Sequence, residues 1–173
     1  MANYEYFSKE PCVIKGRFAD YADAMWVQNK TQESRFKRLV DLYTIAAIVG
    51  LRIGRKLEED SSSENKRTVQ LDAIASCKTT LLQIMRLVII FDDSDGSSPE
   101  ERIETAFKIP ENEATYRKYM DLFNSYVRGG IEYIYEQIIR KPVDIDDDCP
   151  DGRISNMLSF LKNPLKKDLF INK

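Results

Sequence analysis

Residues Arg35 to Lys56 read RFKRLVDLYTIAAIVGLRIGRK, and this stretch decides the fold class. Its apolar residues recur at the spacing i, i+3, i+4, i+7, which places them on one face of a helix. That face consists of Phe36, Leu39, Val40, Tyr43, Ala46, Ala47 and Gly50. We expect a packing role for Gly50 and Gly54, because glycine lets a second helix approach closely.

Two further stretches repeat the helical period, one ending in LVIIF at residues 87–91 and one beginning at Asn112. The sequence therefore predicts an all-α fold, a small bundle of three long helices over about 32–57, 68–91 and 112–140 with short satellite helices. Apolar residues of the second stretch occur on nearly all sides. We therefore expect the second helix to be central and the most buried.

Gly129 and Gly130 fall inside the third stretch, although each costs about 1 kcal/mol relative to alanine in a helix interior. Two explanations are open. Either the glycines divide the stretch into two helices, or a neighbouring backbone packs against them. We assign both a helix-packing role.

The chain has 173 residues, the size of one compact domain. Within a single helical domain over 1–173 we expect an irregular N-terminal arm at 1–30, an acidic linker at 141–152, and a C-terminal helix with a basic tail at 153–173. Within the arm, CVIKGRF at 12–18 could form a short strand, and residues 21–27 could form a short helix. Pro142 ends the third helix, because proline lacks the backbone N–H that a helix interior needs.

Composition and termini favour a cytoplasmic protein with no membrane contact. Hydrophobic residues make up 43% and charged residues 31%, which is ordinary for a soluble globular protein. The start, MANYEYFSKEPCV, lacks the apolar core of a signal peptide, and no run reaches the roughly 18 apolar residues of a membrane span. Three distant cysteines argue against a disulfide framework.

The absence of histidine excludes Ser-His-Asp and Cys-His catalysis and histidine-ligated zinc. We expect no catalytic residue, no metal and no cofactor. The closest approach to a cation loop is Asp92, Asp93 and Asp95 before Gly96. With Gly96 at the sixth position of a calcium loop, the first and twelfth ligands would be Phe91 and Arg102, which do not fit. A metal-dependent nuclease using these aspartates is the least supported hypothesis.

A basic patch is the candidate nucleic-acid contact. Its residues are Arg52, Arg55 and Lys56, with Lys66 and Arg67 beyond a serine-rich loop. The patch could bind DNA phosphates, or its first three bases could simply complement the C-terminal dipole of the helix. The net charge of -2 gives no global attraction to nucleic acid.

Two short motifs lie on the first and third of the expected long helices. The first motif is Asp41, Tyr43, Ala46, Ala47, Gly50, Leu51 and Arg52. The second motif is Tyr126, Gly129, Gly130 and Ile131. With these motifs, the chain resembles the Dnd system-associated protein 4 family of bacterial DNA phosphorothioation gene clusters over about residues 33–140.

The resemblance implies a non-enzymatic accessory or adaptor protein of a DNA-modification-linked anti-phage defence system. Such a protein acts by contacts with other proteins of the same locus, with DNA binding and homo-oligomerisation left open. The alternatives are a DNA-binding regulator of the locus and the metal-dependent nuclease considered above.

Overall fold

The computed structural model describes residues 4–26, 35–140 and 152–162. Its elements run in the order β1 (Cys12–Lys15), α1 (Arg17–Met25), α2 (Leu39–Ile53), β2 (Lys66–Val69), α3 (Leu71–Phe91), α4 (Pro99–Phe107), α5 (Glu113–Tyr135), the π-helical turn η1 (Glu136–Arg140) and α6 (Gly152–Lys162). The fold is helical apart from one two-stranded sheet, so the predicted all-α class is confirmed.

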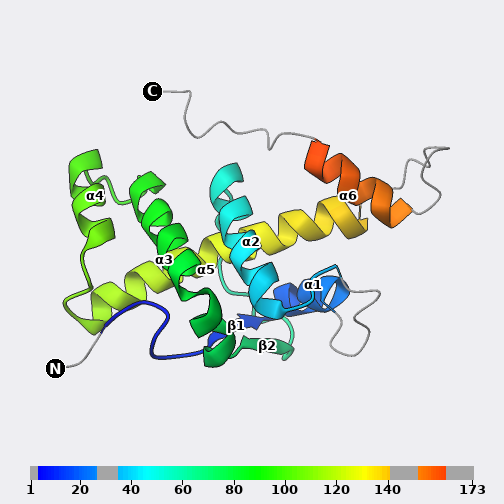
Figure 1. Cartoon of the computed structure of the whole chain (residues 1–173), viewed down its shortest axis with the longest axis horizontal. Coiled ribbons are helices and arrows are strands. Elements are labelled where there is room, and N and C mark those ends of the chain that lie inside the picture. Colours follow the sequence, from blue (N-terminus) through cyan, green and yellow to red (C-terminus); the bar gives the residue numbers. More distant parts are fainter. Residues whose placement is uncertain (1–3, 27–34, 141–151, 163–173) are drawn as a thin grey trace.

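Helix α5 extends across the molecule, and α2 crosses it (Figure 1). The two backbones touch where they cross. A Cβ added to Gly130 would overlap the carbonyl group of Ala46, and one added to Gly50 would overlap the carbonyl group of Tyr126. Helix α5 is continuous through both of its glycines. Of the two explanations for the glycine pair, the structure therefore shows the second, in which a neighbouring backbone packs against the helix.

The position of Gly54 differs from what we expected. The sequence predicted a helix to about residue 57, with Gly54 packing against a neighbour from inside it. Helix α2 ends at Ile53, and Gly54 follows it in the left-handed conformation, with φ 65° and ψ 31°. Its N–H donates to the carbonyl oxygen of Leu51 at 3.0 Å, and the N–H of Arg55 donates to that of Gly50. Gly54 therefore ends the helix, because glycine has no Cβ to oppose this conformation.

Helix α3 is not the most buried helix, which also differs from expectation. Most residues of α2 are buried, whereas α3 keeps a long exposed side that includes Leu71 and Leu87. By length and composition alone, α3 could cross a membrane, and it is the one described helix with this property. Its buried side chains, such as Leu81 and Met85, belong to the common core.

The N-terminal segment expected to be an irregular arm contains a strand and a helix. Strand β1 pairs antiparallel with β2, from Cys12 opposite Val69 to Lys15 opposite Lys66. Helix α1 then packs on α5, where the ring of Tyr21 stacks on that of Tyr135 with centroids 4.2 Å apart. Residues 1–3 and 27–34, the linker at 141–151 and the tail at 163–173 lie outside the described residues.

Side-chain caps begin the two helices that follow α3. At the start of α4, the Ser98 hydroxyl accepts a hydrogen bond from the N–H of Glu101 at 3.2 Å, and the Glu101 carboxylate accepts one from the N–H of Ser98 at 2.8 Å. Pro99 occupies the first helical position. Asn112 caps α5 by accepting from the N–H of Thr115 at 2.8 Å. Such caps satisfy backbone donors that a helix start leaves unpaired. They fix where α4 and α5 begin.

We expect Gly130→Ala to destabilise the protein by about 3 kcal/mol or more, because the new methyl group meets backbone, which yields less readily than a side chain. In an unconstrained helix the same change is stabilising by up to about 1 kcal/mol, so the sign is diagnostic. Urea unfolding measures the effect. Thr80→Ala, at an exposed position in α3, is the control and should stabilise the protein by at most about 0.7 kcal/mol, the difference in helix propensity. A stabilised Gly130→Ala protein would contradict the backbone contact.

Candidate interaction surface

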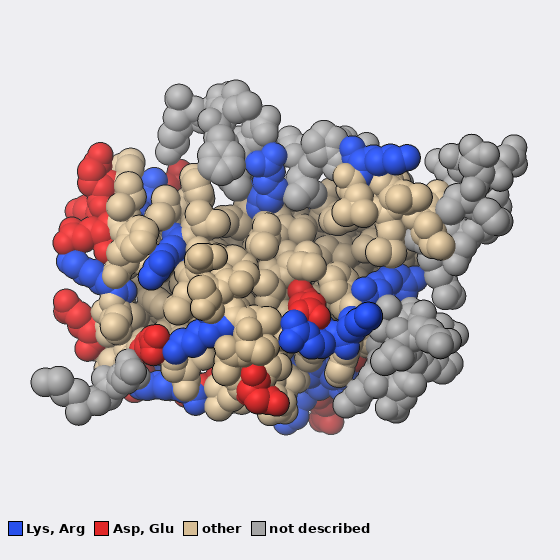
Figure 2. Space-filling view, in the orientation of Figure 1, with Lys and Arg blue, Asp and Glu red and all other residues tan. Residues whose placement is uncertain are grey.

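Several cations of the predicted basic patch form ion pairs with nearby carboxylates. The guanidinium of Arg55 lies 2.9 Å from the carboxylate of Glu136 on η1, and that of Arg67 lies 2.7 Å from Asp23 on α1. Lys56 lies 2.8 Å from Asp92. Figure 2 shows basic and acidic residues side by side on one face of the molecule. This pairing offsets much of the positive charge that would attract a phosphate backbone.

The other two patch residues lie on different elements. Arg52 is in the last turn of α2 and is half-buried. Lys66 is exposed at the start of β2. It lies opposite Lys15, whose ammonium lies 3.4 Å from the carboxylate of Glu59. The five predicted residues are thus divided between the end of α2 and the small sheet.

Asp92 is a buried carboxylate, only 6% exposed, at the end of α3. It accepts hydrogen bonds from the ammonium of Lys56, from the hydroxyl of Tyr126 at 2.7 Å, and from the hydroxyl and N–H of Ser94. Burial raises the pKa of Asp92, but the hydrogen bonds from Lys56, Ser94 and Tyr126 outweigh it and leave the pKa below its ordinary value. The carboxylate thus joins the end of α3 to α5 and to the segment that follows α2.

The neighbouring aspartates do not converge with Asp92. Asp95 accepts from Ser97 and lies 3.0 Å from the ammonium of Lys118, and these contacts lower its pKa to about 2. Asp93 is exposed. Across the described ranges, no three histidine, cysteine or acidic residues lie close enough together to hold a metal ion. The geometry therefore gives the nuclease hypothesis no shared carboxylate site.

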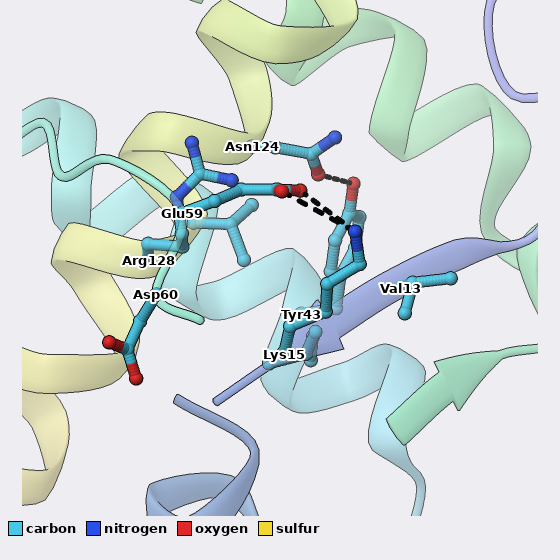
Figure 3. A pocket seen from close by; sticks show the side chains of 9 residues that line it. Val13, Lys15, Tyr43, Glu59, Asp60, Asn124 and Arg128 are labelled. Carbon is cyan, nitrogen blue, oxygen red and sulfur yellow. Dashed lines mark hydrogen bonds and ion pairs between the residues drawn. The ribbon is translucent and has the colours of Figure 1, made fainter. Parts of the chain in front are cut away.

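A small pocket between β1, α2 and α5 is lined by both polar and apolar side chains (Figure 3). The hydroxyl of Tyr43 donates to the side-chain oxygen of Asn124 at 2.7 Å. The Nε of Arg128, beside them, donates to the carbonyl oxygen of Leu57 at 2.7 Å. The cavity has a volume of about 10 Å³, which is room for about one water molecule. It is too small for an organic substrate.

A larger hollow lies between α3 and α4, and we name it the α3–α4 groove. Its volume is about 290 Å³, and the buried side chains of Tyr6, Met85 and Ala106 help to line it. Phe107 and Ile109, which also line it, are 64% and 65% exposed. Large apolar side chains this exposed beside an apolar hollow are typical of a protein-binding surface.

Charged residues flank the α3–α4 groove. The guanidinium of Arg86 lies 4.8 Å from the centre of the Phe107 ring, within range of a cation–π interaction. Lys78 and Glu5 form an ion pair at 3.0 Å nearby, and Glu5 also lines the groove. An apolar centre with a charged rim resembles the anatomy of protein interfaces.

Comparisons with protein-family models, with curated proteins and with solved structures find no match to this chain. The α3–α4 groove is therefore assigned from geometry alone.

Phe107 and Ile109 were not among the residues predicted from the sequence. A usable signal existed, because Ile103 and Phe107 stand four residues apart in a helix whose other positions are largely charged or small. That spacing predicts one apolar side. Whether the side faces the core or solvent depends on how α4 is placed, and in the structure both residues are exposed.

We expect Asp92→Asn to weaken the acid dependence of stability. Because the folded pKa of Asp92 is lowered, its charge stabilises the fold above the unfolded value near 3.8, and this contribution is lost as pH falls through the lower folded pKa. The variant should lose about 1–3 kcal/mol at pH 7, since Lys56 and Tyr126 lose a charged acceptor. It should also unfold less steeply between about pH 4 and pH 2. Chemical denaturation across that range, with exposed Asp93→Asn as the control, measures both effects. Equal acid sensitivity in wild type and Asp92→Asn would contradict this role.

Proposed function

We propose that this protein is a non-enzymatic adaptor that binds another protein through the α3–α4 groove. The observation that carries the proposal is the exposure of Phe107 and Ile109 beside that groove. Burial of one large apolar side chain contributes about 1.5–3 kcal/mol, so a partner that covers both gains a substantial driving force.

We further propose a place for the adaptor in a cytoplasmic bacterial defence system linked to DNA phosphorothioation. Support comes from the resemblance to Dnd system-associated protein 4, combined with the positions of its two motifs. Ala46 and Gly50 of the first motif meet Gly130 and Tyr126 of the second at one helix crossing. A contact shared by residues so far apart in the chain is what a common fold requires, so the resemblance concerns architecture rather than a reactive site.

The partner on this proposal is another protein of the same locus. It would insert apolar side chains between Phe107 and the buried lining of the groove. Arg86, Lys78 and Glu5 at the rim would set its orientation, because exposed charges contribute more to orientation and association rate than to affinity.

We expect Phe107→Glu to reduce capture of the partner at least about tenfold, because it places a charge where an apolar side chain would be buried. Co-expression of the tagged chain with phosphorothioation and restriction proteins, followed by affinity purification and titration, measures this. Leu71→Glu is the matched control, since Leu71 is exposed at the start of α3, several turns before the groove. Equal capture by both variants, with folding intact, would refute the role of the groove.

Duplex DNA belongs in the same experiment. Binding with a steep salt dependence, weakened by Lys66→Ala and Arg52→Ala, would support the DNA-binding regulator instead. Lys56 is left unchanged in this test, because changing it would leave the buried Asp92 carboxylate without its cation.

A further inference from the structure

The side of α2 opposite its contact with α5 is apolar and open to solvent. Ile45 and Ile48 lie in the middle of the helix and are 41% and 47% exposed, so no described residue covers them fully. In Figure 1 α2 lies in front of α5, and the middle of this face is largely uncharged in Figure 2. The two isoleucines are one turn apart, so they form one small continuous apolar patch on an otherwise well-buried helix.

One acid and one base continue the line of these isoleucines along α2. Asp41, Ile45, Ile48 and Arg52 follow one another in steps of four, three and four residues. At 3.6 residues per turn, the four fall within an arc of about 60°. They form a single stripe, which we name the α2 stripe.

The steps along the α2 stripe are four, three and four residues whether it is followed from Asp41 or from Arg52. One end is acidic and the other is basic. If two copies of the helix lie antiparallel, Ile45 of one faces Ile48 of the other at two symmetric places. Asp41 of each then faces Arg52 of the other. The stripe is therefore complementary to itself, which is the property that a twofold symmetric interface requires. A stripe built for an unrelated partner has no need of this symmetry.

We infer that a second copy of this chain binds along the α2 stripe, with the two α2 helices antiparallel about a twofold axis that passes between Ile45 and Ile48. The 15 residues of α2 give a contact about 22 Å long. Leu87 of the neighbouring α3 is exposed and is available to extend it. Asp41 now pairs with Arg38 of its own helix at 2.6 Å, so the dimer exchanges or shares that contact.

The dimer does not rest on the adaptor role, because the α2 stripe and the α3–α4 groove use different residues. If dimerisation through the stripe fails its test, partner binding through the groove can still be tested, and the reverse also holds. A dimer would present two α3–α4 grooves, one from each copy, and so let the assembly hold two copies of a partner.

Sedimentation velocity of the full chain over a concentration series tests the dimer. We expect a reversible dimer whose dissociation constant rises at least about tenfold in Ile48→Lys, because the lysines of both copies enter the apolar centre. Ile103→Lys is the matched control, since Ile103 is exposed to a similar extent on α4, and it should leave the constant unchanged. Circular dichroism checks that both variants fold.

Charge exchange tests the antiparallel register. Asp41→Arg alone and Arg52→Asp alone each place like charges opposite one another twice, so each should weaken the dimer by roughly tenfold. The double variant Asp41→Arg with Arg52→Asp restores opposite charges and should restore association. Mixing the two single variants should give a heterodimer stronger than either homodimer.

Three results would overturn the inference. The first is a protein that stays monomeric up to about 100 µM, a concentration at which a dimer with a dissociation constant of about 1 µM would be almost fully formed. The second is a dimer that Ile48→Lys does not weaken, or whose charge reversals are not rescued in the folded double variant. The third is a monomer in which Ile48→Lys removes binding of a different protein, which would assign the stripe to that partner.

Discussion

The contact between the backbones of α2 and α5 is the constraint on which the rest of the structure depends. Ala46 and Gly50 lie directly against Tyr126 and Gly130, so the two helices approach as closely as their main chains allow. With this distance fixed, side chains at either end can link the same helices. Tyr43 donates to Asn124 on one side of the crossing, and Arg55 reaches Glu136 beyond the other. The polar contacts therefore depend on a contact that involves no side chain at all.

Much of this architecture was predictable from the sequence, since the helical period by itself places Tyr43, Ala46 and Gly50 on one face. The relative burial of the helices was not. An apolar stretch such as residues 74–91 has the same pattern whether neighbours cover one of its sides or all of them, and only the packing shows that α3 keeps an exposed side. The role of Gly54 was not predicted for a related reason. Glycine is favoured both where a helix ends and where another helix packs closely against it, so the residue type alone does not separate the two roles.

The candidate sites were harder to predict, because they depend on pairs of residues far apart in the chain. From the sequence, Lys56 is one cation of a basic patch. Only the fold shows that it pairs with the Asp92 carboxylate, which lies 36 positions further along the chain. Phe107 is the last residue of the short helix α4, and the groove beside it is lined in part by Tyr6 and Met85 from two other segments. Local sequence gives the chemistry of each residue, whereas the fold decides which residues meet. A pattern that repeats within one helix, such as the α2 stripe, is the exception.

Tyr43 and Asn124, which are bonded across the helix crossing, are 81 positions apart. During synthesis α2 leaves the ribosome long before α5 exists, and until then its apolar side has no permanent cover. Closure of such a long loop also slows folding, because chain entropy is lost before the distant contact forms. The nascent chain is therefore exposed to aggregation over most of its elongation, and it gains its core only when almost all of the described residues have emerged.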